Sequence, residues 1–523
     1  MIRPARKAIV HVFIWLLAVM LIAVGCSSGS SKSPGQSSGG SSKPQYGGTL
    51  RLAVNGDANS LGDITVMRSL YDMMLSAPAV QTLAQADKDG EMEHILAESM
   101  TPDPDKNEIT IKLKQGIRFH DDTPFNAEAL KWILEYYNSA RPEISSMDTA
   151  TVVDEYTLLL KLKQWDSTMM EALASIPIVS PTATQKNGKE WIDKNPVGTG
   201  PFKFVKWEKN IGVSYVKNEN YWEEGKPYLD AIEITIVADK LAGSMSFQNK
   251  EFDIYTAFEP QLVNSLKEHG QVVTLPDGLG GSAASIMFNS KDADSPFADL
   301  RVRQAVAHAI DVKAIVDSQF FGYAQASPQW GLPGAWFYNS DIKGYPYDPE
   351  KAKQLLREAG YPNGFTTNLW HLPNQDQMNF YAAVQGYLKE VGIDVKLQPV
   401  ETGKYRELQS QGWDGMLHAA LRGDGLGVFM PPAYVPGGFY SASLNVPPRL
   451  FDLFTELKAA KTTEDKKRIA YEIQSLVFHD ELITLHLYVT KEPVLKAFNV
   501  HGDEINIRSQ TPYWKPQNAW IEQ

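Results

Sequence analysis

The chain has 523 residues, of which 43% are hydrophobic and 11% aromatic, so it is long and apolar enough to build several large cores. Its formal net charge of −12 argues against nucleic acid as a partner, because nucleic-acid surfaces are read by basic patches. A single cysteine excludes a disulfide within the chain, so burial has to supply the folding free energy.

The first 26 residues have the pattern of an export signal. Arg3, Arg6 and Lys7 precede an apolar run over residues 8–24, and Gly25 and Cys26 follow it. The run is short for a membrane span, which needs about 20 residues. We therefore expect residues 1–26 to be a signal peptide that is removed at Cys26. The alternative is an N-terminal membrane helix that is retained.

Residues 27–45, SSGSSKSPGQSSGGSSKPQ, are expected to form a tether. They contain nine serines, four glycines and no apolar side chain, so nothing offsets the entropy cost of ordering them. A flexible chain of this length spans roughly 25 Å.

Helical and strand patterns alternate through the rest of the chain, which predicts α/β domains. The clearest helix follows Asp348, a capping residue, with Pro349 at its first position and Gly360 at its end. Residues 393–397 alternate between apolar and polar side chains and predict a strand. Residues 108–119 and 156–165 predict antiparallel strands, each with one polar face.

No motif in the chain points to a cofactor or a metal. The glycine-rich stretch 278–283 leads into an apolar strand pattern, whereas a dinucleotide-binding loop must open a helix. The ten histidines are scattered and form no metal-binding motif. We therefore predict neither a cofactor nor a metal centre. The sequence leaves open whether two carboxylates form a catalytic pair of the glycosidase type, because such a pair is defined by the distance between the side chains in the fold.

Aromatic side chains are frequent in segments that have no helix or strand periodicity. One interpretation is that they line a cleft and stack on an organic ligand; the other is that they fill the core beneath long loops. The candidate ligand-binding residues in these segments are Trp330, Trp336, Tyr338, Trp370, His371, Tyr434, Phe439 and Tyr440.

Several stretches, in this order, resemble the family 5 solute-binding proteins of ABC importers, the oligopeptide, dipeptide and nickel type. They are GGTLRLAV (47–54), LAESMTPDPDKNEITIKLKQGIRFHDDTPFNAEAL (96–130), VGTGPFKFVKWEKNIGVSYVKNENYW (197–222) and MFNSKDADSPFADLRVRQAVAHAID (287–311). The resemblance extends from about Gly47 to near the C-terminus.

The resemblance implies an α/β fold of the class II periplasmic-binding-protein type. Such a fold has two lobes joined by a hinge, an extra α+β domain in the first lobe, and a ligand enclosed by hinge closure. The implied divisions are domain I at 46–65, 198–286 and 492–523, domain II at 66–197, and domain III at 287–491.

The resemblance also gives Cys26 a role as the lipidated N-terminus of a lipoprotein. The processing motif that ends at the lipidated cysteine usually has leucine three residues before it, and this chain has Ala23 there. Several acyl chains, at about 0.8 kcal/mol per buried methylene, give durable anchoring. The implied location is the outer face of the cytoplasmic membrane. The implied partners are ABC permease subunits and, through them, ATPase subunits, with the protein itself a monomer.

In peptide-binding members an aspartate after a "YD" or "WD" strand receives the peptide ammonium group. In this chain the stretch GWDGMLHAALRGDG places Asp424 near that position, with spacing one residue longer and without the usual Asp-Pro. Asp424 is therefore the candidate amine acceptor; its alternative is a turn between glycines. Arg422 is a candidate partner for a carboxylate, and its alternative is a solvated cation.

The function implied is capture of a small polar solute, an oligopeptide or dipeptide, for delivery to a permease, without catalysis. One alternative is the same scaffold binding an oligosaccharide or a metal chelate. A more distant alternative is a secreted hydrolase.

Overall fold

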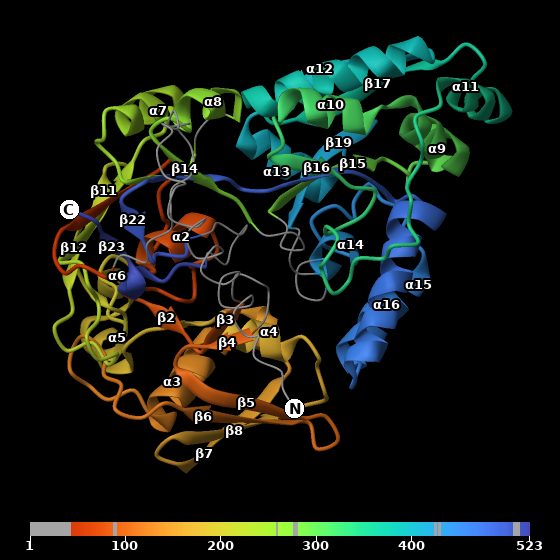
Figure 1. Ribbon diagram of the computed structural model, residues 1–523. Helices are drawn as coiled ribbons and strands as arrows, with labels where there is room; N and C mark the ends of the chain where they lie inside the picture. The colour runs from red at the N-terminus through yellow and green to blue at the C-terminus, as the bar shows by residue number, and fades with distance from the viewer. Residues whose placement is uncertain are drawn as a thin grey trace, which may run out of the picture. The chain divides into compact units, whose positions relative to one another are not determined.

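The fold is described from a computed structural model of the chain (Figure 1). The described residues are 43–86, 92–257, 260–275, 281–422, 426, 430–505 and 513–523. The predictions for the signal peptide, Cys26 and the tether up to residue 42, and the prediction for Asp424, lie outside them. The helices and strands of the described residues lie in one compact unit, Pro44–Gln523.

The first large sheet has seven strands drawn from three separate stretches of the chain. Its order is β10 (Phe202–Glu208), β11 (Gly212–Lys217), β12 (Ala231–Ile236), β1 (Thr49–Val54), β13 (Ile254–Tyr255), β21 (Val494–Ala497) and β14 (Gly270–Val273). Strand β1 runs parallel to both β12 and β13, and the other pairs are antiparallel. The carboxyl end of β1 therefore lies between two parallel neighbours.

The second large sheet has six strands. Its order is β16 (Ala324–Ala326), β20 (Thr484–Thr490), β15 (Ser282–Phe288), β19 (Met416–Arg422), β17 (Phe365–His371) and β18 (Ile393–Pro399). Strand β17 runs parallel to β18 and β19. The predicted strand at 393–397 is confirmed by β18, in which Ile393 and Val395 are buried while Asp394 and Lys396 are exposed.

A smaller antiparallel sheet has the order β5 (Ala97–Asp103), β6 (Glu108–Leu113), β8 (Thr157–Leu162) and β7 (Met147–Asp154). The predicted antiparallel strands are confirmed, because β6 pairs with β8. Three further pairs are two-stranded: β2 (Gln81–Thr82) with β9 (Pro177–Ile178), β3 (Ala84–Ala86) with β4 (Met92–His94), and β22 (Val500–His501) with β23 (Trp520–Ile521).

The helices cover these sheets. With the smaller sheet and the seven-stranded sheet lie α2 (Leu70–Ser76), α3 (Ala127–Asn138), α4 (Met169–Ala174), α5 (Pro181–Asn187), α6 (Lys189–Ile192), α7 (Lys240–Gln248) and α8 (Val263–Leu266). With the six-stranded sheet lie α9 (Leu300–Ala309), α10 (Val312–Gln319), α11 (Pro349–Glu358), α12 (Gln375–Glu390), α13 (Thr402–Gln411), α14 (Pro431–Tyr434), α15 (Pro448–Ala459) and α16 (Thr463–Ser475).

The helix predicted after Asp348 is confirmed by α11. The Asp348 carboxylate accepts a hydrogen bond from the Lys351 backbone N–H at 2.9 Å, and Pro349 occupies the first helical position. The apolar stripe of the helix, including Leu355 and Leu356, is buried against the six-stranded sheet and its helices.

The six-stranded sheet separates two cores. Ile286 and Phe288 of β15 face the core made with α9–α12, and Ala283 and Met287 face the core made with α13–α16. Figure 1 shows α9–α12 along one side of the strands and α14–α16 toward the other. Because side chains alternate along a strand, β15 is apolar on both faces and is buried on both.

The chain passes twice between the two large sheets, once from β14 to β15 and once from β20 to β21. The Gly281 N–H donates to the Thr490 carbonyl at 3.1 Å, and the Leu275 N–H donates to the Lys491 carbonyl at 3.0 Å. The two crossings therefore run beside each other. We call the part before Leu275 and after Lys491 the first lobe, and the part between the crossings the second lobe.

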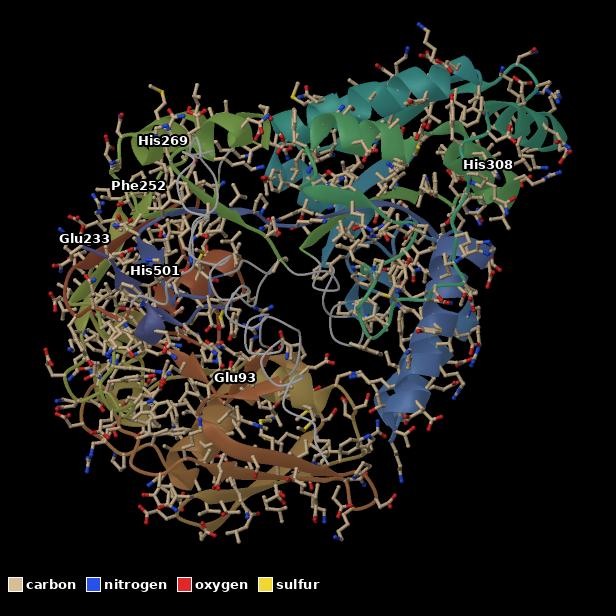
Figure 2. All side chains as sticks on the ribbon, viewed as in Figure 1. Glu93, Glu233, Phe252, His269, His308 and His501 are labelled. Atoms are coloured by element: carbon tan, nitrogen blue, oxygen red, sulfur yellow. The ribbon has the colours of Figure 1, made fainter. Side chains whose placement is uncertain are left out.

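The C-terminal segment belongs to the first lobe. Lys515 pairs with Glu93 of β4 at 3.0 Å, and the ring of His501 stacks on Trp520 with centroids 4.3 Å apart. Figure 2 labels Glu93 and His501, and both lie among first-lobe elements. The N–H of the C-terminal residue Gln523 donates to Gln45 Oε1 at 3.1 Å, four residues before β1 begins.

Gly364 permits a close backbone approach at the start of β17. Its φ is +73°, and a Cβ added there would lie 1.8 Å from the carbonyl oxygen of Gly392. We expect Gly364→Ala to lower the free energy of unfolding by roughly 3 kcal/mol, since both backbone strain and a clash with a rigid carbonyl arise. Urea denaturation measures this.

Gly360→Ala is the matched control. Its φ is +92°, but a Cβ there would meet nothing within 4 Å. This substitution should lower the free energy of unfolding by only about 1 kcal/mol, because it adds backbone strain but no clash. If the two variants lose equal unfolding free energy, the close approach to Gly392 does not contribute to the effect.

Candidate functional site

Both large sheets direct the carboxyl ends of parallel strands toward loops that carry polar residues. In open α/β sheets, ligands bind outside such ends. In the first lobe β1 ends at Val54 and is followed by Asn55. In the second lobe β17 ends at His371 and β19 ends at Arg422. These ends are the structural candidates for a binding site.

Glu492 ties the end of β19 to the two crossings. Its Oε1 accepts hydrogen bonds from the Ser282 N–H at 3.0 Å and from the Thr490 hydroxyl at 2.7 Å. Ser282 is the register partner of Arg422. A Cβ on Gly281 would lie 2.3 Å from the Glu492 side chain, so glycine is needed for this approach. The carboxylate thus joins both crossings beside the end of β19.

Asn55, which follows β1, is bound by a tyrosine of the first lobe. The Tyr71 hydroxyl of α2 donates to Asn55 Oδ1 at 2.6 Å. Burial raises the pKa of Tyr71, and the negative charge of Glu492 raises it further. The charge of Glu492 thus acts on the tyrosine that binds the residue after β1.

A buried polar chain supports the loop that follows β17. The Leu372 N–H donates to Gln377 Oε1 at 2.9 Å, so the Gln377 amide nitrogen faces His418 Nε2 at 3.0 Å and donates to it. A neutral His418 then carries its proton on Nδ1 and donates it to the Tyr381 hydroxyl at 2.6 Å. Burial lowers the pKa of His418 to about 3, which keeps the ring neutral.

His371 and Trp370 point to opposite faces of β17. His371 is 1% exposed, its Nδ1 lies 2.8 Å from the Leu372 carbonyl, and burial lowers its pKa. Trp370 is half-buried, and its indole N–H donates to the Asp414 carbonyl at 3.0 Å. The structure therefore does not bring these two candidate residues together on one wall.

Three histidines that are buried and neutral make stability depend on pH. Burial lowers the pKa of His120 and His486 to about 4 and that of His418 to about 3, against 6.5 when unfolded. Because the folded-state pKa values are depressed, the stabilisation is present above pH 6.5 and is lost as pH falls. Each histidine should lower the free energy of unfolding by about 2 kcal/mol when the pH falls from 7 to 5.

Urea midpoints measured across this range test the dependence. His418→Gln should reduce the loss of unfolding free energy between pH 7 and pH 5 by about 2 kcal/mol, because it removes the contribution of one titrating group. A loss unchanged by the substitution would mean that His418 is not buried as a neutral ring.

The other candidate residues lie in different environments. Trp330, Tyr434 and Tyr440 are at most 4% exposed and pack in the core beneath β15 and β19. Phe439 is 63% exposed, and Trp336 and Tyr338 are half-buried. The core interpretation thus describes three of the aromatic residues, Trp330, Tyr434 and Tyr440.

One open groove of about 600 Å³ lies at the amino end of β19, beside α13. Of the predicted residues only Trp370 lines it. Its other lining residues are Asn289, Lys291, Asp292, Lys404, Leu408, Gln411, Gly412, Trp413, Asp414, Ala442 and Ser443. It lies at the end of β19 opposite to Arg422, away from the crossings.

The sequence profile of the bacterial extracellular solute-binding proteins, family 5, matches residues 91–444. The chain belongs to this family. A glutathione-binding protein GsiB from Pectobacterium atrosepticum is 34% identical over 374 residues, which cover 68% of this chain and 68% of that protein. The GsiB protein of Escherichia coli K12 is 32% identical over 373 residues, covering 68% and 69%.

Solved family 5-like structures confirm the predicted two-lobe α/β fold. DppA from Helicobacter pylori, in complex with the peptide STSA, superposes with a TM-score of 0.75 at 24% identity and covers 92% of this chain and 99% of its own. CtaP from Listeria monocytogenes has a TM-score of 0.81 at 19% identity and covers 92% and 100%. Family 5 proteins are extracytoplasmic binding proteins, not enzymes, that work with ABC permease and ATPase subunits.

Within the described ranges, no helix is both long and apolar enough to span a bilayer. Sequence reasoning missed Tyr71, Gln377 and Glu492. No local pattern marks them, because each acts through a residue that the fold brings from elsewhere. The only available signal was the position of Glu492 at the crossing implied by the family resemblance.

Proposed function

We propose that this chain captures a short peptide or peptide-like solute between its lobes and delivers it to the permease of an ABC importer. The observation that carries the proposal is the position of the end of β19 beside the two crossings that join the lobes, where Glu492 binds Ser282. A solute held there contacts both lobes and favours the closed form.

Two oppositely charged residues that are close together in the sequence suit a zwitterionic ligand. Arg422 is the last residue of β19, and Asp424 follows two residues later. A guanidinium and a carboxylate this close in sequence match the carboxylate and ammonium groups of a free peptide. Relatives that bind glutathione, itself a peptide, agree with this solute class.

We also propose the three-domain division and the lipid anchor for this chain. The seven-stranded sheet supports a discontinuous domain I, since its strands come from residues 49–54, 202–273 and 494–497. The sheet formed by β5–β8 lies wholly within the proposed domain II, residues 66–197. Residues 1–26 direct export, Cys26 carries the lipid, and the tether holds the protein at the outer face of the cytoplasmic membrane.

Thermal unfolding with a panel of solutes tests the function. Glutathione, Met-Leu and Ser-Thr-Ser-Ala should raise the melting temperature by several degrees, because ligand at 100 times its Kd adds about 2.7 kcal/mol. Maltotriose and Fe(III)-EDTA are the comparison solutes. Shifts from these alone would replace the peptide proposal with the oligosaccharide or chelate alternative, and peptide cleavage detected by mass spectrometry would indicate a hydrolase.

A further inference from the structure

The carboxyl end of α15 in the second lobe is bound by the first lobe. The Ser167 N–H donates to the Lys458 carbonyl at 2.7 Å, and the Ser167 hydroxyl donates to the Leu457 carbonyl at 2.6 Å. The indole N–H of Trp165 donates to the Ala460 carbonyl at 2.8 Å. The last carbonyls of a helix have no partner within the helix. Here residues almost 300 positions away in sequence bind two of them, those of Leu457 and Lys458, and also the carbonyl of the capping residue Ala460.

Three ion pairs between the lobes surround these hydrogen bonds. Lys466 pairs with Glu171 at 2.9 Å, and the two side chains are 18% and 35% exposed. Lys461 pairs with Asp105 at 2.7 Å, and Lys458 lies 3.9 Å from Asp166. In every pair the second lobe supplies the cation and the first lobe the anion. We call Trp165, Ser167 and Glu171, with the end of α15 and Lys466, the latch.

The latch is buried at its centre and separate from the strand ends that form the candidate site. Trp165 is 9% exposed, Ala460 is 7% exposed and Leu457 is 1% exposed. None of these latch residues belongs to the ends of β1, β17 or β19 in the described structure. When the lobes separate, each hydrogen bond is exchanged for one to water and the ion pairs are lost. The latch therefore favours closure whatever lies between the lobes.

We propose that Trp165 and Ser167 are positioning residues that control how long the closed form retains its solute, without contacting that solute. This rests on the proposed capture of a solute between the lobes. The apparent affinity for a ligand is proportional to the fraction of protein that is in the closed, binding-competent form. Residues that favour closure therefore raise the affinity and slow the release of the ligand.

Substitution of Trp165 by phenylalanine tests the latch. Trp165→Phe keeps an aromatic ring but removes the donor to Ala460, so the Ser167 amide should exchange its hydrogen roughly threefold to tenfold faster in ligand-free protein. Glutathione, as the probe, should dissociate faster by a similar factor. The matched control is Trp207→Phe, whose lost donor binds Asp57 within the first lobe at 3.0 Å. Equal exchange at Ser167 in both variants would overturn the proposal.

Swapping the charges of Lys466 and Glu171 distinguishes loss of the latch from a general folding defect. Lys466→Glu and Glu171→Lys should each speed exchange at Ser167 about tenfold, and the double variant should return to within twofold of the parent. Additive losses in the double variant would contradict the latch. Because exchange is read without solute, failure of glutathione to bind would count against the proposed function alone and would leave this result standing.

Discussion

Cys26→Ser is expected to move the protein from the membrane fraction to the soluble fraction while leaving solute binding unchanged. The proposed anchor is the acyl chains on Cys26, each buried methylene of which contributes about 0.8 kcal/mol of membrane affinity. The chain contains no other cysteine to carry them. Fractionation with detergent phase separation, followed by intact mass, measures both the location and the lipid.

Ser28→Ala is the matched control, because it changes one hydroxyl two residues later in the proposed tether. It should remain in the membrane fraction with its lipid mass. If Cys26→Ser protein stays in the membrane, residues 8–24 are an uncleaved anchor. In that case the signal-peptide interpretation of the N-terminus is wrong.

Asp424→Ala should weaken peptide binding by roughly 100-fold. Removing one partner of an enclosed charge pair costs about 2–5 kcal/mol, since the ligand ammonium is then left without its counter-charge. Calorimetric titration with Ser-Thr-Ser-Ala measures the loss. The same peptide with an acetylated amino group should bind the parent weakly and should not distinguish the variant from it.

Asp414→Ala serves as the control, because it removes another carboxylate ten residues earlier in the chain. Asp414 lies at the amino end of β19 in the groove, where it accepts hydrogen bonds from Asn368 and Trp370. It should leave peptide binding within about twofold of the parent. If Asp424→Ala also leaves peptide binding intact, the aspartate is only a turn residue. Retained sugar binding in the same variant would favour the oligosaccharide alternative.

Local elements of this fold could be predicted because their causes lie within a few residues. The cap at Asp348 and the alternation in β18 each depend on side chains and backbone groups less than one element apart. The aromatic loop residues were harder to place. Trp330 and Tyr434 are buried and Phe439 is exposed, although the sequence shows no helix or strand periodicity around any of them, and Tyr434 proves to end α14. Which of them is covered depends on helices that arrive from later in the chain.

The sequence by itself determined the α/β class and, through ordered motifs, the family. These follow from periodicity and from patterns that are contiguous along the chain. Only the tertiary structure decided that Glu492 binds Ser282 and that Ser167 binds the end of α15. The first contact joins residues 210 apart and the second joins residues 290 apart. No pattern along the chain encodes such pairs, because they exist only after two lobes have formed and the crossings have brought them together.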